Sequence, residues 1–281
     1  MSGTLYLVGT PIGNLEDMTF RAVRVLKEVD MIAAEDTRNS IKLLNHFEIT
    51  TPMTSYHEFN KYDKAKTLVE MLLSGKNVAV ITDAGMPGIS DPGEELVKQA
   101  HEAGINVTGV PGATAFTDAL VISGLPTRRL SFEAFLPHDK KERTFILDEL
   151  KNDTRTICIY EAPHRLVKTL ELLYGALGER RISVCRELTK KHETIFQSTF
   201  SEAIAYYKEN APKGECVIVV EGKGVDELID EARSEWDRLT IPEHLDIYLQ
   251  KGIDKKEAMK LVAKDRGISK RDVYQAVMIG D

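Results

Sequence analysis

Short apolar runs alternate with amphipathic stretches through the first 125 residues of the chain. Four runs have the length and the bounding turn residues of buried strands: residues 4–9, 31–34, 77–83 and 105–112. Three stretches with a period of about 3.6 residues predict helices: residues 19–27, 61–73 and 94–103. Strands that alternate with helices form βαβ units, so this part of the chain predicts a mainly parallel sheet.

The pattern changes after a predicted helix at residues 114–125. Five apolar runs follow it: residues 130–136, 154–160, 181–188, 193–199 and 216–222. Two of these runs succeed one another between residues 181 and 199 with no helix between them, which indicates a mixed or antiparallel sheet. We therefore predict an α/β fold with two α/β domains: residues 1–122 with a parallel sheet, and residues 123–224 with a mixed sheet.

The remaining residues, 225–281, lose strand character and read as helical. Positions 254–265 have an amphipathic pattern, and Ser269 is placed to cap a second helix that begins at Asp272. A helix, a short glycine turn and a second helix form the outline of a helix-turn-helix. A small helical cap on the main domains explains this pattern equally well.

The charge of the chain is negative overall but uneven. The 281 residues carry a net charge of −7, which argues against a nonspecific nucleic-acid coat. Residues 251–271, however, contain eight bases and three acids, and smaller basic clusters occur elsewhere, for example at Arg128 and Arg129. Each cluster alone fits a solvated face, but together they allow an RNA-facing surface on an acidic body.

Two classes of protein are excluded by simple counts. No window approaches the ~18 consecutive apolar residues of a membrane span, and no basic segment precedes a long apolar stretch at the start, so we expect a cytoplasmic protein without a membrane partner. Cys158, Cys185 and Cys216 are far apart and each lies in an apolar run, so we expect buried structural thiols and no metal site.

A glycine-rich connection follows the predicted strand at 77–83. Asp91 is a natural N-cap and Pro92 suits the first helical position, which leaves residues 83–90 as a loop at the carboxyl end of a parallel strand. Ligands of open α/β sheets bind at that edge. The loop has no lysine and contains Asp83, so it is no phosphate loop, and its glycine spacing misses the dinucleotide fingerprint. A neutral or cationic ligand fits it, as does a tight connection without a ligand.

Two other strand ends carry similar loops. Gly9, Pro11 and Gly13 lie at the end of the first strand. The strand predicted at 105–112 likewise ends in a glycine- and proline-containing segment, residues 109–115. Because parallel strands end at one edge of their sheet, we expect the three loops to build one rigid rim.

Eight ordered motifs then support a resemblance to a known family. They are "VGTPIGNLEDMTFRA", "AEDTR", "SYHEFN", "ITDAGMPGISDPG", "VPGATA", "YEAPHR", "CRELTKKHET" and "PKGECVIVVEG". The chain resembles the tetrapyrrole methylase superfamily of S-adenosylmethionine-dependent enzymes, and "AEDTR" with "YEAPHR" resembles its ribosomal RNA methyltransferase subgroup. The resemblance covers residues 4–222 and extends to the helical segment at 255–277.

The resemblance implies a fold and a reaction. It implies homodimers of two α/β domains, with S-adenosylmethionine in the cleft between the domains, and 2'-O-methylation of a cytidine ribose in the decoding region of 16S ribosomal RNA. The substrate is free RNA or the assembled 30S subunit. Two alternatives stay open: a small-molecule methyltransferase of the tetrapyrrole type, which shares fold and cofactor, and a DNA-binding regulator, which explains the helical end alone.

Site residues follow from the motifs of the resemblance. It implies cofactor contacts from Pro11, Asp83, Ala84, Gly85, Met86, Pro87, Ile89, Thr114, Ala115, Tyr160, Glu161, Leu188 and Ile218. The ribose hydroxyl must lose a proton, and candidates for the acceptor are Glu35, Asp36, Glu187 and Lys190. Candidates for RNA contacts are Arg38, His57, Arg165 and Arg186. Each acid could instead cap a helix, and each arginine could instead pair with a neighbouring glutamate.

Overall fold

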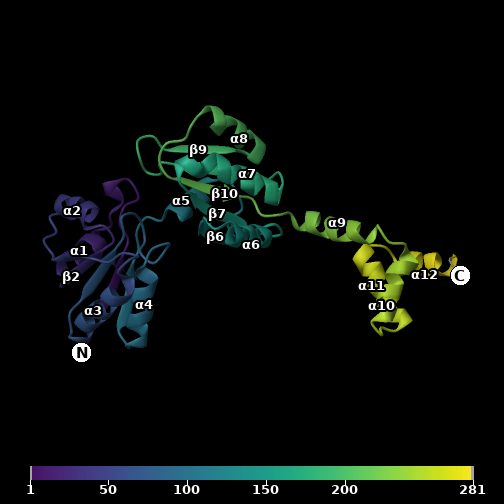
Figure 1. The fold of residues 1–281 in the computed structure, drawn as a ribbon, viewed down its shortest axis with the longest axis horizontal. Coiled ribbons are helices and arrows are strands. Elements are labelled where there is room, and N and C mark those ends of the chain that lie inside the picture. The colour runs from purple at the N-terminus through teal and green to yellow at the C-terminus, as the bar shows by residue number, and fades with distance from the viewer. Residues whose placement is uncertain (1, 280–281) are drawn as a thin grey trace. The chain divides into compact units, whose positions relative to one another are not determined.

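The computed structural model describes residues 2–279, which fall into two compact units. We call residues 1–150 and 155–221 the body, and residues 151–154 and 222–281 the tail. The body contains two five-stranded sheets, and the tail contains four helices (Figure 1). The predicted domain boundaries at 122/123 and 224/225 stay predictions.

The first sheet of the body is parallel throughout, with strand order β3-β2-β4-β1-β5. Its strands are β1 (Thr4–Val8), β2 (Met31–Ala34), β3 (Met53–Ser55), β4 (Val78–Ile81) and β5 (Asn106–Val110). The helices that connect them are α1 (Phe20–Glu28), α2 (Thr37–His46), α3 (Lys61–Leu73) and α4 (Gly93–Glu102), with a short 3-10 helix at Leu15–Asp17. This confirms the predicted parallel sheet.

Helices cover both faces of this sheet. The apolar side chains of α1 and α2, among them Leu26 and Leu44, pack on one face, and those of α3 and α4, among them Leu68 and Leu96, pack on the other. All four residues of β4 are buried, as a strand between two helical layers requires. The polar strand ends and their loops are left to form the functional edge.

The second sheet is mixed, with strand order β6-β7-β10-β8-β9. Its strands are β6 (Leu130–Phe135), β7 (Thr156–Glu161), β8 (Arg181–Arg186), β9 (Thr194–Thr199) and β10 (Cys216–Val220). β6 and β7 are parallel, whereas β10 pairs antiparallel with β7 and β8, and β8 with β9. The antiparallel pair predicted between residues 181 and 199 is confirmed.

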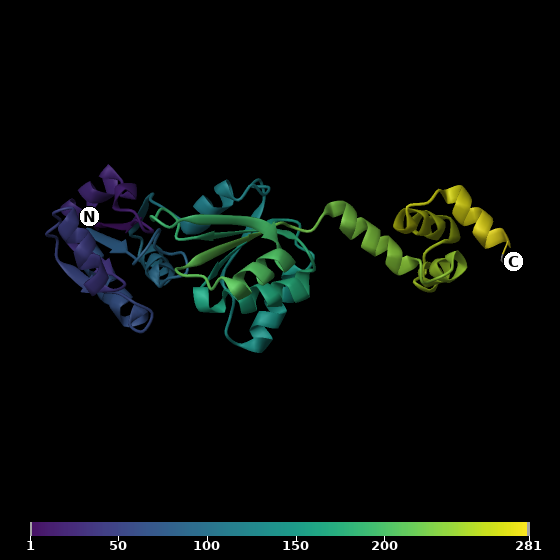
Figure 2. The same cartoon turned by 90° about the horizontal axis from the view of Figure 1, so that it is seen from above.

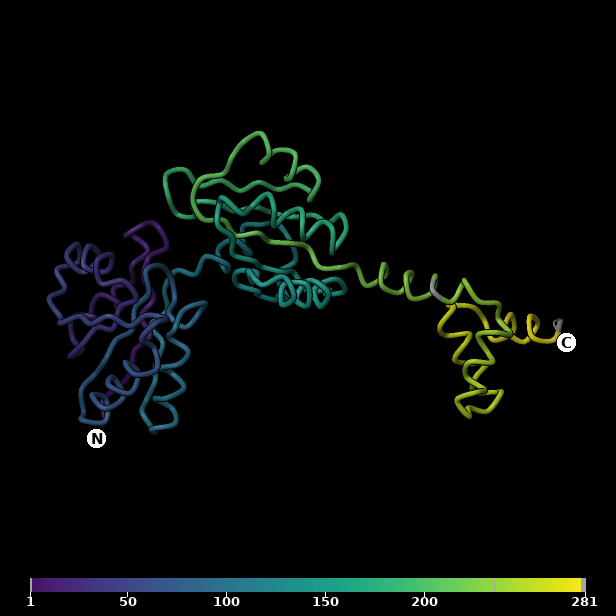
Figure 3. The backbone as a smooth tube through the Cα atoms, in the orientation of Figure 1, coloured from purple at the N-terminus to yellow at the C-terminus, as the bar shows by residue number. Residues whose placement is uncertain are grey.

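The two faces of the second sheet are covered differently. Its helices are α5 (Ala115–Ile122), α6 (Lys140–Leu150), α7 (Leu166–Leu177) and α8 (Phe200–Glu209), with a 3-10 helix at Pro163–Arg165. The helices α6 to α8 bury one face of the sheet, and α5 packs on the other, as Figure 2 shows. The chain reaches α5 directly from β5, so one continuous stretch joins the two sheets (Figure 3).

The tail has its own small core. Its helices are α9 (Val225–Trp236), α10 (Ile241–Gln250), α11 (Lys255–Arg266) and α12 (Lys270–Ile279). Leu245, Val262 and Val273 come from α10, α11 and α12 and are buried together. Gly267 ends α11 in a left-handed conformation, and the Ser269 hydroxyl accepts from Asp272 N–H at the start of α12, as predicted for its N-cap.

One local prediction needs correction, and one strand was missed. The helix after the glycine-rich loop begins at Gly93 rather than at Pro92, and Asp91 binds the loop as well as the first helical N–H. The three-residue strand β3 at the edge of the sheet was not predicted, because so short a segment carries no alternation.

Candidate functional site

A cavity of about 340 Å³ lies in the body at the carboxyl edge of the first sheet. Its lining on that side comes from the ends of β1, β2, β4 and β5: Ile12, Glu35, Thr82 to Met86, Ile89 to Asp91, Thr114 and Ala115. The second sheet contributes the rest: Phe135, Tyr160, Cys185, Glu187, Leu188, Lys190, Glu215, Cys216 and Val217. We call this space the main cavity. The resemblance implied a cofactor cleft between the two α/β domains, and the lining of the main cavity includes residues from both sheets.

The backbone of the glycine-rich loop is fixed by hydrogen bonds to the Asp91 carboxylate. Gly85 and Gly88 have φ values of +85° and +88°, which residues with a side chain rarely adopt. The Asp91 carboxylate accepts hydrogen bonds from the N–H groups of Gly88, Ile89 and Gly93 at 2.8–3.1 Å. The loop therefore needs no ligand to keep its shape.

The three strand-end loops form one rim. Thr10 and Gly85 exchange two backbone hydrogen bonds of 2.9 and 3.1 Å, which tie the first loop to the glycine-rich loop. Gly9 approaches Gly112 so closely that a Cβ on Gly9 would lie 2.7 Å from the Gly112 Cα. Glycine is required at both positions because any side chain would separate the strand ends. The predicted rim is confirmed.

Glu35 is fixed on the floor of the main cavity. Its Oε2 accepts a 2.5 Å hydrogen bond from the Thr82 hydroxyl and a longer one, 3.4 Å, from Asp83 N–H. The same end of the loop is also held from α2, where the Asn39 amide donates to the Asp83 carboxylate at 3.0 Å. Glu35 and Asp83 are thus locked side by side at the end of β4.

Asp36 and Arg38 lie outside the main cavity. Asp36 is the N-cap of α2, and its carboxylate accepts from Arg38 N–H and from the Arg38 guanidinium. The hydrogen bonds from Arg38 lower the pKa of Asp36 to about 2. Asp36 therefore fits its structural alternative, a helix cap and ion-pair partner, better than a proton acceptor.

Glu187 and Lys190 form the opposite wall. Glu187 has a left-handed φ of +51° directly after β8, and its carboxylate pairs with the Lys190 ammonium at 3.0 Å. Gly214 makes room for this carboxylate, since a Cβ there would lie 1.9 Å from Glu187 Oε1. Lys190 in turn packs on Gly13, so the pair is in contact with the first loop.

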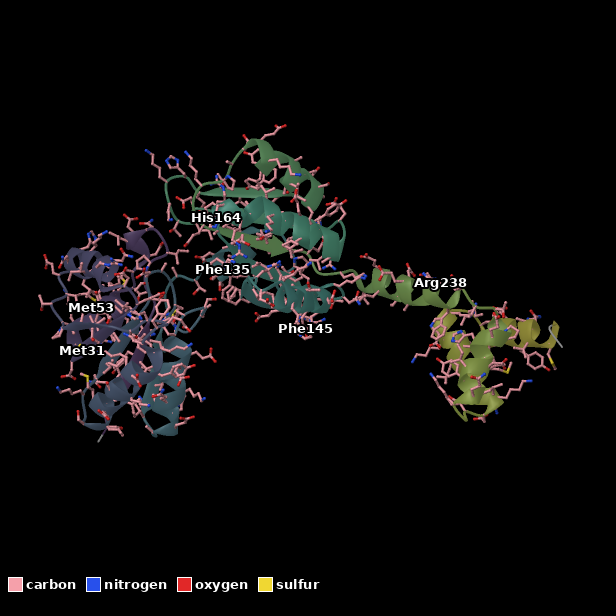
Figure 4. The ribbon with its side chains drawn as sticks, in the orientation of Figure 1. Met31, Met53, Phe135, Phe145, His164 and Arg238 are labelled. Atoms are coloured by element: carbon pink, nitrogen blue, oxygen red, sulfur yellow. The ribbon has the colours of Figure 1, made fainter. Side chains whose placement is uncertain are left out.

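Aromatic side chains close one end of the main cavity. Tyr160 packs edge-on to Phe132 and tilted to Phe135, and its hydroxyl accepts from Phe116 N–H. Phe135 is labelled at the end of β6 in Figure 4 and is 45% exposed. Burial is the main cause of the raised pKa of Tyr160, which stays a neutral phenol. This end offers flat apolar surfaces to a ring system.

Several predicted residues lie away from the main cavity. Ile218 faces the core beneath the sheet, and Val217 lines the cavity in its place, because successive strand residues point to opposite faces. Glu161 is fully buried and accepts from Ala162 N–H and the Thr169 hydroxyl. Ile218 and Glu161, from which the resemblance implied cofactor contacts, are therefore both absent from the lining of the main cavity. Pro87 is absent from the lining as well.

The predicted RNA-contacting residues are scattered. Arg165 binds Glu161 at 3.4 Å and the Leu136 carbonyl at 3.1 Å, which is the internal role weighed as its alternative. The Arg186 guanidinium donates to the Lys213 carbonyl. His57 follows β3 at the edge of the sheet. None of the three lines the main cavity.

The sequence did not single out some of the lining residues. Phe135 and Glu215 belong to this group, and both stand at strand ends that meet the cavity. The register that pairs Phe135 with Tyr160 could have suggested the first, because paired residues share a face.

The lining suits a cation. It contains five carboxylates, Glu35, Asp83, Asp91, Glu187 and Glu215, and the single ammonium of Lys190. A cavity with this balance repels phosphate and favours a positive charge. The aromatic end fits an adenine ring, and the glycine backbone at Gly85 allows close approach, so the residues fit S-adenosylmethionine.

Neither thiol in the lining is reactive. Burial raises the pKa of Cys216 to about 12 and raises that of Cys185 as well. Within residues 2–279, no group of three metal-binding side chains is close enough to hold an ion. In the same part of the chain, every helix is too short or too polar to cross a bilayer.

Comparisons with known proteins identify the family of the chain. The family model described as tetrapyrrole (corrin/porphyrin) methylases matches residues 4–204. A protein of Halalkalibacterium halodurans is 50% identical over 97% of this chain and 93% of its own, and one of Bacillus subtilis is 50% identical over 99% and 94%. A Synechocystis protein is 47% identical over 97% and 96%. All three are named ribosomal RNA small subunit methyltransferase I.

Solved structures share the fold. Diphthine synthase superposes with a TM-score of 0.64 at 13% identity, covering 79% of this chain and 90% of its own. Uroporphyrin-III-C-methyltransferase from Thermus thermophilus has a TM-score of 0.56 at 21% identity, covering 78% and 94%. The chain therefore belongs to the tetrapyrrole methylase family, within it to the ribosomal RNA small subunit methyltransferase I family, and its cofactor is S-adenosylmethionine.

Proposed function

We propose that this protein methylates the ribose 2'-oxygen of a cytidine in the decoding region of 16S ribosomal RNA. The main support is the acidic main cavity with its glycine-containing loops. It occurs in a chain that is 50% identical to proteins named ribosomal RNA small subunit methyltransferase I. The enzyme acts as a homodimer, and its ribosomal substrate puts it in the cytoplasm. Free RNA and the assembled subunit are both possible acceptors.

The cofactor would be held by residues of both sheets. We propose contacts to its methionine part from the loop of Asp83 to Ile89 and from Thr114 and Ala115, and to its adenosine part from Tyr160 and Leu188. When bound, S-adenosylmethionine supplies a methyl group on a sulfonium. The sulfur leaves as a neutral thioether when the ribose oxygen bonds the methyl carbon. The chain needs to position the two partners and to accept one proton.

We propose Glu187 as the proton acceptor. Both hydrogen bonds that Glu35 accepts hold the floor of the main cavity, so Glu35 is a positioning residue. Glu187 is linked only to Lys190 by its side chain among the described residues, and the pair faces the first loop. An ammonium beside the carboxylate also offsets negative charge when RNA phosphates approach.

Substrate selection tests this function. The protein is incubated with methyl-labelled S-adenosylmethionine and, separately, with unmethylated small subunits, free ribosomal RNA and uroporphyrinogen. We expect label in the subunits or the RNA. Label in the tetrapyrrole alone would contradict the proposal. Gly85→Val is the control for the main cavity, because its side chain would meet Ala113 and Ile12 in a left-handed conformation.

A further inference from the structure

A second cavity of about 310 Å³ adjoins the main cavity. The two share Ile12, Thr82, Asp83 and Ala84 in their linings. The second cavity continues from this border to the first loop, at Pro11, Gly13 and Leu15, and to α2, at Asn39, Ser40, Lys42 and Leu43. A ligand in it would therefore lie directly beside a ligand in the main cavity.

We infer that the second cavity is the acceptor subsite, which seats the ribose and adjoining phosphate of the target nucleotide. This inference rests on the proposed function. A methyl acceptor must reach the donor from a space of its own, because attack occurs on the side of the methyl carbon opposite to the leaving sulfur. A cavity that meets the cofactor cavity across Asp83 and Ala84 provides such a space.

The side chains of the second cavity fit a ribonucleotide. The Lys42 ammonium pairs with no carboxylate of residues 2–279, in contrast to Arg38 and Lys190, which are both paired. An unpaired lysine beside a cavity suits a phosphate, as a point charge. Leu15 also lines the second cavity, is 42% exposed and offers apolar contact to a sugar or base.

Ser40 adds a second, independent observation. Its side chain is 4% exposed and its hydroxyl has no hydrogen-bond partner among the described residues. Buried hydroxyls are rarely left unpaired, because such a group has lost its hydrogen bonds to water and gained none in exchange. The residue borders the second cavity, so a ribose hydroxyl there would supply the partner that Ser40 lacks.

Asn39 connects this subsite to the main cavity. Its amide donates to Asp83 Oδ2 at 3.0 Å, at the border that both cavities share. The Lys190 side chain packs on Gly13, which also lines the second cavity. The proposed proton acceptor, Glu187, is bound to Lys190 and is thereby linked to the first loop, which lines the second cavity.

The test separates acceptor binding from cofactor binding. Lys42→Ala and Ser40→Ala are compared with the wild type by the KM for unmethylated small subunits, by filter binding of subunits without cofactor, and by calorimetric Kd for S-adenosylmethionine. We expect Lys42→Ala to raise KM and subunit Kd about tenfold, as for a charged hydrogen bond, with cofactor Kd changed less than twofold. Lys42→Arg should restore most of the affinity.

Controls exclude a change in folding or in overall charge. Lys27→Ala removes the same charge from the exposed face of the neighbouring helix α1 and should leave KM unchanged. Ser40→Ala should weaken subunit binding without lowering the melting temperature, since it deletes a hydroxyl that binds nothing in the chain. A stability loss in place of the affinity loss would overturn the inference.

The inference and the proposed function fail in different ways. Wild-type activity on subunits with unchanged KM and subunit Kd in both alanine variants would overturn the subsite and leave the function intact. Equal weakening of cofactor and subunit binding would also overturn it. If the wild type methylates no RNA, the proposed function is wrong and the subsite falls with it.

Discussion

At the scale of single residues, the main cavity depends on acids that bind backbone. Asp91 holds three N–H groups of the glycine-rich loop, and Glu35 holds the Thr82 hydroxyl and Asp83 N–H. These carboxylates are occupied by the protein itself. Asp83 and Glu187 also line the cavity, and we distinguish them as the carboxylates that face a ligand. Asp91 and Glu35 are the carboxylates that shape the cavity.

Removing the Asp91 carboxylate should loosen the loop. Asp91→Ala leaves the N–H groups of Gly88, Ile89 and Gly93 without their acceptor. We expect a loss of about 1–2 kcal/mol in the free energy of unfolding and a roughly tenfold higher Kd for S-adenosylmethionine. Denaturant unfolding and calorimetry measure both. Asp63→Ala, at a 97% exposed side chain, is the control and should change neither.

Glu187 and Glu35 should separate chemistry from binding. Glu187→Gln should lower kcat about a hundredfold, the usual range for loss of a proton acceptor, with cofactor Kd within twofold. Glu35→Gln should instead weaken cofactor binding, because its hydrogen bonds hold the loop. Single-turnover rates and calorimetry decide between them. A Glu35→Gln variant that binds cofactor normally but does not react would exchange the two roles.

At the scale of elements, α9, α10 and α11 surround a buried histidine in the tail. His244 stacks on Trp236 with ring centroids 3.8 Å apart, accepts from the Arg266 guanidinium at Nδ1, and lies 3.4 Å from Asp265. Burial first, and the charge of Arg266 second, lower the pKa of His244, against the opposing effect of Asp265. His244 is therefore neutral in the folded tail.

This histidine makes the tail sensitive to acid. The unfolded state binds a proton below its ordinary pKa of 6.5, whereas the folded state takes it up only at lower pH. The stability of the tail should therefore fall as pH drops from 6.5 toward the folded pKa, and become level below that value. Hydrogen exchange of α10 and α11 between pH 7.5 and 5 measures this. Protection that is independent of pH in this window would contradict it.

Elements were more predictable from the sequence than side-chain roles. The loops after β1, β4 and β5 are determined by glycine and proline residues within the loops themselves, so the rim could be predicted from the sequence. The pairing of Arg165 with Glu161, four residues away, was an alternative that the sequence already offered. The contact of Arg165 with the Leu136 carbonyl and the orientation of Ile218 depend on packing between distant segments, which the sequence does not display. The same holds for the second cavity, whose residues come from the first loop, from helix α2 and from the residues that follow β4.

At the scale of the whole molecule, the main cavity, where we propose that the cofactor binds, belongs entirely to the body. Every lining residue of the main cavity falls between Ile12 and Val217. The basic residues of the tail have mixed roles: Arg266 binds backbone carbonyls inside the tail, and Lys260 pairs with Glu257. The basic charge of the tail is concentrated in residues 251–271, which contain eight bases and three acids.

Removing the tail should affect the two substrates differently. A chain that ends at Gly222 should bind S-adenosylmethionine with a Kd within twofold of the full chain. We expect its catalytic efficiency on small subunits to fall about tenfold, with a reduced dependence on salt, because phosphate contacts are lost. Kinetics between 50 and 200 mM salt measure this, because the affinity of a protein with about six phosphate contacts falls steeply over that range. Unchanged efficiency would assign the tail a structural role only.

The proposed 2'-O-methylation is tested most directly by identifying the methylated nucleoside. Unmethylated small subunits are treated with the full chain and S-adenosylmethionine, and their RNA is digested to nucleosides and fragments for mass spectrometry. We predict a single 2'-O-methylcytidine in the decoding region, absent when Gly85→Val replaces the wild type. Methylation of a base, methylation at a ribose outside that region, or no RNA methylation by a chain that binds the cofactor would contradict the proposal.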